Sequence, residues 1–122
     1  MQQILIILGI LFCHFIFDFI CQTDKNALGK SKNWTDLLEH TASYSALWFM
    51  VLLPFCGINC IPQLLWLAPI TFVVYTIQDY ITSREVVKLY KAGRRHDMFV
   101  VIGLDQFLHY CQLLITFQLL IQ

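Results

Sequence analysis

The chain has 122 residues, of which 58% are hydrophobic and 13% are charged, and its formal net charge is zero. Soluble domains carry about a quarter charged residues, so this composition excludes an ordinary soluble protein and indicates an integral membrane protein. A helix needs about 20 apolar residues to cross the hydrocarbon core of a bilayer. We therefore expect four spans joined by short loops, forming a single domain over residues 1–122.

Four apolar stretches predict four membrane-spanning helices. The predicted spans cover residues 3–21, 37–55, 63–82 and 98–121. A polar loop over residues 22–36 follows the first span. A short uncharged turn over residues 56–62 follows the second, and its Gly, Asn and Pro residues disfavour a continuing helix. The third helix is expected to continue as an amphipathic helix to Tyr90, and the basic loop 91–96 ends it.

The positive charges of the chain predict its orientation in the membrane. All eight Lys and Arg residues are Lys25, Lys30, Lys32, Arg84, Lys88, Lys91, Arg94 and Arg95. They fall in two segments separated by two spans, so they face one compartment, which the positive-inside rule assigns to the cytoplasm. We expect an all-α, antiparallel four-helix membrane bundle with both termini outside (N-out, C-out), as a multi-pass protein of the inner (cytoplasmic) membrane.

Six ionisable residues lie inside the apolar stretches, where such side chains are rare and usually functional. They are His14, Asp18, His40, Asp79, Asp105 and His109. The first two are four residues apart, as are the last two, and residues four apart share a helix face. Their order is reversed between the first and fourth spans, which run in opposite directions. The carboxylates of the two spans are therefore predicted to lie at one depth, nearer the cytoplasm, and their imidazoles deeper.

This set of side chains predicts a metal site. Carboxylates packed together repel one another, and a divalent cation offsets both this repulsion and the cost of burying charge. Mixed imidazole and carboxylate ligands suit Zn²⁺, Mn²⁺ or Fe²⁺. We assign all six residues as metal ligands for one or two ions. Asp18, Asp79 and Asp105 are also the catalytic candidates, because a carboxylate not needed as a ligand can act as general base.

Several other polar residues are expected to support this site. Gln22, Tyr75 and Gln106 are predicted to hydrogen-bond the ligands, although contacts between helices explain such residues equally well. Arg84 and Lys25 are candidates for binding an anionic substrate, since they belong to the basic rim of the predicted cytoplasmic mouth. The same basic residues also serve as the orientation signal and attract anionic lipid.

Four segments resemble a family of small, uncharacterised membrane proteins of bacteria and their phages. They are residues 14–25 (HFIFDFICQTDK), 38–40 (LEH), 79–84 (DYITSR) and 103–110 (GLDQFLHY). The resemblance spans nearly the whole chain, and that family in turn resembles membrane-bound proteins described as metal-dependent hydrolases. It implies metal binding and hydrolysis but identifies no substrate. The family pattern places His four residues before the third-span Asp, where this chain has Tyr75, which weakens one ligand or leaves one complete metal site.

The leading hypothesis is a metal-dependent hydrolase that acts on a phosphoester or lipid head group at the cytoplasmic interface. One alternative is an ion or proton channel or transporter with an Asp/His core, which would need a homo-oligomer because four helices enclose little pore. Another is a membrane interaction protein in which the polar layer only fixes helix register. The expected partners are the lipid bilayer and an anionic lipid or phosphorylated substrate, with no nucleic acid.

Overall fold

The computed structural model describes residues 1–120, apart from the side chains of residues 55 and 56, and it is all-helical. No strand occurs among the described residues. The helices are α1 (Gln2–Phe15), α2 (Asp24–Gly29), α3 (Trp34–Cys56), α4 (Ile61–Lys91) and α5 (Arg95–Leu120). A π-helical turn, η1 (Ile16–Ile20), extends α1, and a 3₁₀ turn, η2 (Ile58–Cys60), joins α3 to α4. The predicted all-α class is confirmed.

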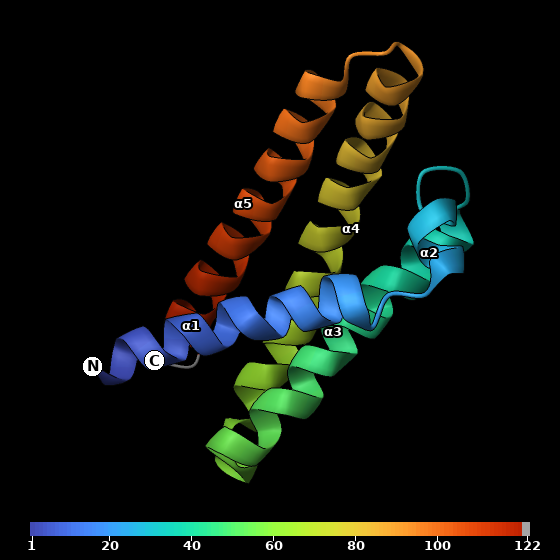
Figure 1. Ribbon diagram of the computed structural model, residues 1–122. Coiled ribbons are helices and arrows are strands. Elements are labelled where there is room, and N and C mark those ends of the chain that lie inside the picture. The colour runs from blue at the N-terminus through green and yellow to red at the C-terminus, as the bar shows by residue number, and fades with distance from the viewer. Residues whose placement is uncertain (121–122) are drawn as a thin grey trace.

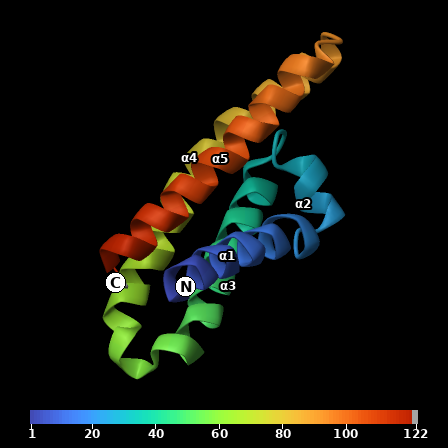
Figure 2. The same cartoon turned by 60° about the vertical axis from the view of Figure 1, so that its left-hand side comes forward.

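The two longest helices, α4 and α5, form an antiparallel hairpin and lie side by side in both views (Figure 1; Figure 2). α3 runs antiparallel to the first half of α4 and packs against it. α1 crosses the hairpin obliquely and contacts α5, while the short α2 lies against α3. Four helices therefore meet around the middle of the hairpin, and its far end projects beyond the others.

The hairpin matches the sequence-based boundaries closely. α4 runs without a break to Lys91, which confirms the predicted extension of the third span. The chain then reverses at Gly93, whose φ of 72° lies in the left-handed region that glycine adopts without strain. The Arg94 N–H donates to the Leu89 carbonyl at 3.0 Å, a bond typical of helix ends. The end of the fourth predicted span, residue 121, lies outside the described residues.

The segment predicted as a polar loop over residues 22–36 contains the helix α2, so that prediction was wrong in part. Thr23 lies just before α2, and its hydroxyl accepts a hydrogen bond from the Asn26 N–H at 3.2 Å. Such a cap satisfies one of the amide groups that a helix start leaves unpaired. The sequence signal was a Thr followed by Asp in the first turn, which is a common helix start.

Three described stretches are long and apolar enough to cross a membrane: Gln2–Ile20, Ile58–Lys91 and Arg95–Leu120. They correspond to the first, third and fourth predicted spans. α3, the second predicted span, has 23 residues and is long enough to cross a membrane. It is not among the three stretches that are also apolar enough. Its buried face carries polar side chains, including His40, Thr41 and Ser45, which lower its apolar character. The structure therefore supports membrane association through three helices.

The burial pattern is the reverse of that in a soluble protein. Many large apolar side chains are exposed on α1, α4 and α5, for example Phe12, Trp66 and Phe107, each more than half exposed. Polar side chains such as Thr71, Asp79 and His109 are almost fully buried. An apolar surface of this extent far exceeds the patches that soluble monomers expose, and it suits contact with lipid.

The contact between α2 and α3 leaves no room for a side chain at Gly29. An alanine Cβ there would lie 2.8 Å from the Asp36 Cβ and closer to its carboxyl group. Gly29→Ala should therefore lower the free energy of unfolding by about 1–3 kcal/mol through overpacking, measured as thermal unfolding in detergent. Gly103→Ala is the matched control, because nothing lies near that position, and it should be neutral or stabilising by up to about 1 kcal/mol. Equal stability of both variants would contradict the prediction.

Candidate functional site

Six ionisable residues from five helical elements are brought together inside the molecule, and all six are buried. They are His14 from α1, Asp18 from η1, His40 from α3, Asp79 from α4, and Asp105 and His109 from α5. The structure thus places every predicted metal-ligand residue in one cluster. Its members differ in what their polar atoms contact, and these contacts separate the residues that can hold a metal from those that position others.

The π-helical turn η1 positions Asp18. The Cys21 N–H donates to the Ile16 carbonyl five residues earlier at 2.8 Å, which widens the helix by one residue at this point. Single π-helical turns occur often at functional sites. The turn directs the Asp18 carboxylate toward His40, whose Nε2 lies 3.1 Å from Oδ1.

Asp79 lies at the centre of the cluster. Its Oδ1 is 3.3 Å from His109 Nε2, and its Oδ2 is 3.1 Å from Lys30 Nζ and 3.4 Å from His40 Nε2. One carboxylate therefore contacts groups from the turn after α2, from α3 and from α5. Burying an ion without such partners would cost several kcal/mol.

Three of the residues form a candidate metal centre: Asp79, Asp105 and His109 each offer one ligand atom, and these atoms all lie within 4.8 Å of one another. His109 Nε2 is 3.3 Å from the nearer oxygen of Asp79 and 3.4 Å from Asp105 Oδ2. Ligands at 2.0–2.1 Å from a tetrahedral metal ion are about 3.3 Å apart. The two distances from His109 match this value, and the chemistry of the donor set suits a divalent ion such as Zn²⁺, Mn²⁺ or Fe²⁺.

The Asp105 carboxylate is held in a fixed orientation. The Thr82 hydroxyl donates to Oδ1 at 2.6 Å, and the Gln106 amide donates to Oδ2 at 3.2 Å. Gln78 donates to the main-chain carbonyl of Asp105 at 2.7 Å. Hydrogen bonds of this kind orient metal ligands and are needed for tight binding.

His14 positions Gln106 and has no nitrogen left for a metal. The Tyr44 hydroxyl lies 2.6 Å from His14 Nδ1, and Gln106 Oε1 lies 2.9 Å from His14 Nε2. Because Gln106 Nε2 donates to both Asp18 and Asp105, its Oε1 must accept from His14 Nε2–H. His14 Nδ1 then accepts from the tyrosine. His14, which was predicted as a metal ligand, instead contacts Gln106, and Gln106 in turn donates to the carboxylates of Asp18 and Asp105.

Tyr75, at the position where the sequence resemblance led us to expect histidine, packs flat against the candidate ligand His109. Its ring stacks on His109 with centroids 3.7 Å apart and on Tyr44 with centroids 4.1 Å apart. Its buried hydroxyl bonds to none of the described residues, and neither does His109 Nδ1. Together with Trp48 and Leu113, the two tyrosines belong to an apolar cluster on the side of the site away from the basic residues.

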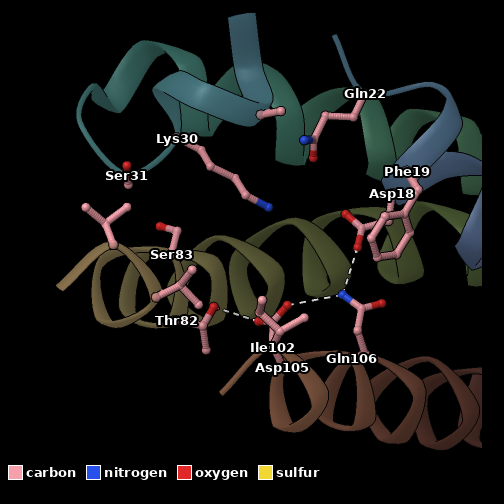
Figure 3. Close-up of a pocket in the computed structure, with 13 residues that line it drawn as sticks. Asp18, Phe19, Gln22, Lys30, Ser31, Thr82, Ser83, Ile102, Asp105 and Gln106 are labelled. Atoms are coloured by element: carbon pink, nitrogen blue, oxygen red, sulfur yellow. Dashed lines mark hydrogen bonds between the residues drawn. The ribbon is translucent and has the colours of Figure 1, made fainter. Parts of the chain in front are cut away.

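A cleft of about 250 Å³ leads to the carboxylates from the other side (Figure 3). The polar residues that line it are Asp18, Asp105, Gln106, Lys30, Gln22, Ser31, Thr82 and Ser83. The predicted residue Gln22 is thus part of the cleft wall. Phe19, Val86, Val87 and Ile102 supply an apolar wall. The Ser83 hydroxyl is buried and bonds to none of the described residues.

The two cations predicted to bind substrate, Arg84 and Lys25, do not line this cleft. The Arg84 guanidinium lies 3.7 Å from the centroid of the Tyr80 ring and donates to the Tyr80 carbonyl at 2.9 Å. Lys25 is exposed and contacts the carboxylates of Glu39 at 2.9 Å and Asp36 at 3.2 Å. The Glu39 carboxylate is the main cause that raises the pKa of Lys25.

The cation that the structure does place at the site is Lys30, which the sequence analysis did not assign to it. Burial lowers the pKa of Lys30, but the carboxylates of Asp79 and Asp18 raise it more, so its pKa lies above the usual value. Its Nζ lies 3.1 Å from Asp79 Oδ2, so the geometry is that of an ion pair. A lysine in a loop has no periodicity, and its role follows only from the position of α2.

The hydrogen bond from Tyr44 to His14 yields a stability prediction. Tyr44→Phe removes the hydroxyl and leaves His14 Nδ1 buried without a donor, which should cost about 1–3 kcal/mol of unfolding free energy. Tyr110→Phe is the control, because its ring meets the same imidazole edge to face, while the two His14 nitrogens have Tyr44 and Gln106 as their partners. That change should stay within about 0.5 kcal/mol. Thermal unfolding in detergent measures both, and an unchanged Tyr44→Phe protein would refute the assigned bond.

Comparison with known proteins places the chain in a family. A family model described as "Protein of unknown function (DUF3307)" matches residues 4–122. Searches of curated proteins and of solved structures found no match. The family match covers all five helices except the first residues of α1, so the chain belongs to the DUF3307 family.

Proposed function

We propose that this protein is a membrane-embedded, metal-dependent hydrolase that acts on a phosphoester or a lipid head group at the cytoplasmic interface. The observation that carries the proposal is the convergence of Asp79, Asp105 and His109, whose ligand atoms lie within 4.8 Å of one another, beside a cleft that Lys30 lines. Bundle interiors are a common place for metal ions held by facing helices.

The charges of the cluster are compatible with a divalent cation. Asp18, Asp79 and Asp105 contribute three negative charges, and Lys30 contributes one positive charge. Imidazoles that bind a metal are neutral, so one divalent ion together with Lys30 would balance the three carboxylates. Without an ion, protonation of His40 and His109, each of which lies beside two carboxylates, gives the same balance. Bound there, a divalent ion would stabilise the negative charge that develops on the phosphoryl oxygens during hydrolysis.

The residues that line the cleft would accept the proton of the attacking water and bind the phosphate group. Asp18 lies outside the three-ligand set but lines the cleft, so it is the carboxylate available to take a proton from an attacking water. Gln106 donates to its Oδ2 at 3.0 Å and holds it in place. Lys30 and the unpaired Ser83 hydroxyl face the same space and suit the oxygens of a phosphate group.

The cleft reaches the carboxylates from one side of the molecule. This favours a hydrolase over a channel or transporter formed by a single chain. The cleft opens beside Lys30, on the side of α4 that leads to the basic residues. On the opposite side, Tyr44 and Tyr75 pack into the apolar cluster. A channel formed by one chain would need a polar path through that cluster.

The same proposal includes the orientation in the inner membrane, with four crossings and both termini outside. Four crossings put the two termini on the same side, whereas three crossings, with α3 outside the bilayer, put them on opposite sides. In a full-length chain carrying an epitope tag at each end, protease added to spheroplasts should therefore digest both tags. A cytoplasmic protein in the same spheroplasts should stay intact. Digestion of one tag alone would show an odd number of crossings.

Metal content and activity of matched variants test the hydrolase. Asp105→Asn should weaken metal binding at least about tenfold, since even groups that only orient a ligand contribute that much. Asp97→Asn is the control on the same helix, where the exposed carboxylate pairs with Arg94. Asp18→Asn should keep the metal and slow hydrolysis by about 10²–10⁴-fold, the usual contribution of a general base.

Mass spectrometry of chelator-free protein measures the metal, and release of inorganic phosphate measures turnover. p-Nitrophenyl phosphate and vesicles of a lipid phosphate monoester distinguish a soluble from a lipid substrate. Circular dichroism checks that each variant is folded. A folded wild-type protein without metal, or Asp18→Asn with full activity, would overturn the proposal.

A further inference from the structure

The two oxygens of the Asp79 carboxylate face two different groups of side chains. Oδ1 faces His109 Nε2 at 3.3 Å, next to Asp105. Oδ2 faces His40 Nε2 at 3.4 Å, and the same nitrogen lies 3.1 Å from Asp18 Oδ1. One carboxylate is thus shared between two sets of possible ligands.

The two sets have the same chemical composition. The first lobe consists of Asp79 Oδ1, Asp105 and His109, and the second lobe consists of Asp79 Oδ2, Asp18 and His40. Each contains two carboxylates and one imidazole, and a shared carboxylate is how proteins hold two metal ions close together. The lobes differ in two respects. Among the described residues, the first lobe is the set whose three ligand atoms all lie within 4.8 Å of one another, and Lys30 Nζ lies 3.1 Å from Asp79 Oδ2, in the second lobe.

The position of Lys30 is set by the backbone around α2. Lys30 follows α2 directly, in a tight turn where the Lys32 and Asn33 N–H groups both donate to the Gly29 carbonyl at 2.8 Å. From this turn its side chain extends toward the carboxylates (Figure 3). The side chain is 20% exposed, so it reaches the cluster from the cleft. A lysine ammonium is a compact point charge, comparable to a bound cation.

We propose that the Lys30 ammonium occupies the place of a second cation. The chain would then hold one divalent ion, in the first lobe, and loss of Lys30 would open the second lobe to another. This inference rests on the metal site of the proposed function, and it adds that each chain binds one divalent ion and not two. One divalent ion and one ammonium balance the three carboxylates. Without Lys30, the second lobe retains a negative charge that attracts a further cation.

Manganese stoichiometry of the full-length protein in lipid nanodiscs tests this inference. Protein loaded with Mn²⁺ and passed through gel filtration is analysed by mass spectrometry. We expect one ion per chain for wild type and for Lys30→Arg, which keeps the charge, and two for Lys30→Met. Lys32→Met is the matched control: it removes an exposed charge two residues away and should leave one ion bound.

Electron paramagnetic resonance supplies an independent measurement. Two Mn²⁺ ions that share the Asp79 carboxylate lie close enough for their spins to couple, whereas a single ion gives an uncoupled spectrum. We expect a coupled spectrum for Lys30→Met alone. Adding Asp18→Asn to that variant removes a ligand of the second lobe and should return the protein to one uncoupled ion.

The outcomes separate this inference from the proposed function. Two ions in wild type, or one ion in Lys30→Met that retains its helical content and thermal midpoint, would overturn the inference and leave the first-lobe metal standing. Lys30→Gln replaces Lys30→Met if the latter does not fold, with the same expected count. Absence of manganese from wild type and from the folded Lys30 variant would overturn the proposed function and the inference together.

Discussion

The arrangement of the whole molecule depends on the pairing of one buried carboxylate, that of Asp79. Its partners Lys30, His40 and His109 come from the turn after α2, from α3 and from α5, while Asp79 itself lies on α4. Removing a partner from a buried ion is strongly destabilising. The relative positions of these segments are therefore fixed by the same contacts that form the candidate site, so stability and site geometry are coupled.

Two layers with opposite character surround this carboxylate. On one side the stacked rings of Tyr44, Tyr75 and His109 join an apolar cluster. On the other side lies the cleft, which Asp18 and Asp105 line. The tyrosines provide large apolar surface to pack the bundle, and the carboxylates remain close to an opening. This asymmetry gives the site one direction of access.

Spacing and periodicity were enough to predict the four long helices and the meeting of the ionisable residues, but not the short helix α2. The reversed order of His14–Asp18 and Asp105–His109 indicated the convergence, because residues four apart share a face. Spacing did not separate His14 from the candidate ligands, since that distinction depends on hydrogen bonds to Tyr44 and Gln106. Nor did it identify Lys30, whose role depends on the three-dimensional path of a short helix.

The length of α4 determines how deep the carboxylates of the candidate site lie in a membrane. At 1.5 Å per residue, Asp79 lies about 27 Å along α4 from Ile61, and the end of the helix lies about 18 Å farther. A hydrocarbon layer about 30 Å thick that begins near Ile61 would end just past Asp79. The carboxylates would then occupy the boundary zone, where the penalty for a charged group is much smaller than at the midplane. A polar group bound at the cluster would then stay in contact with the hydrated boundary of the bilayer.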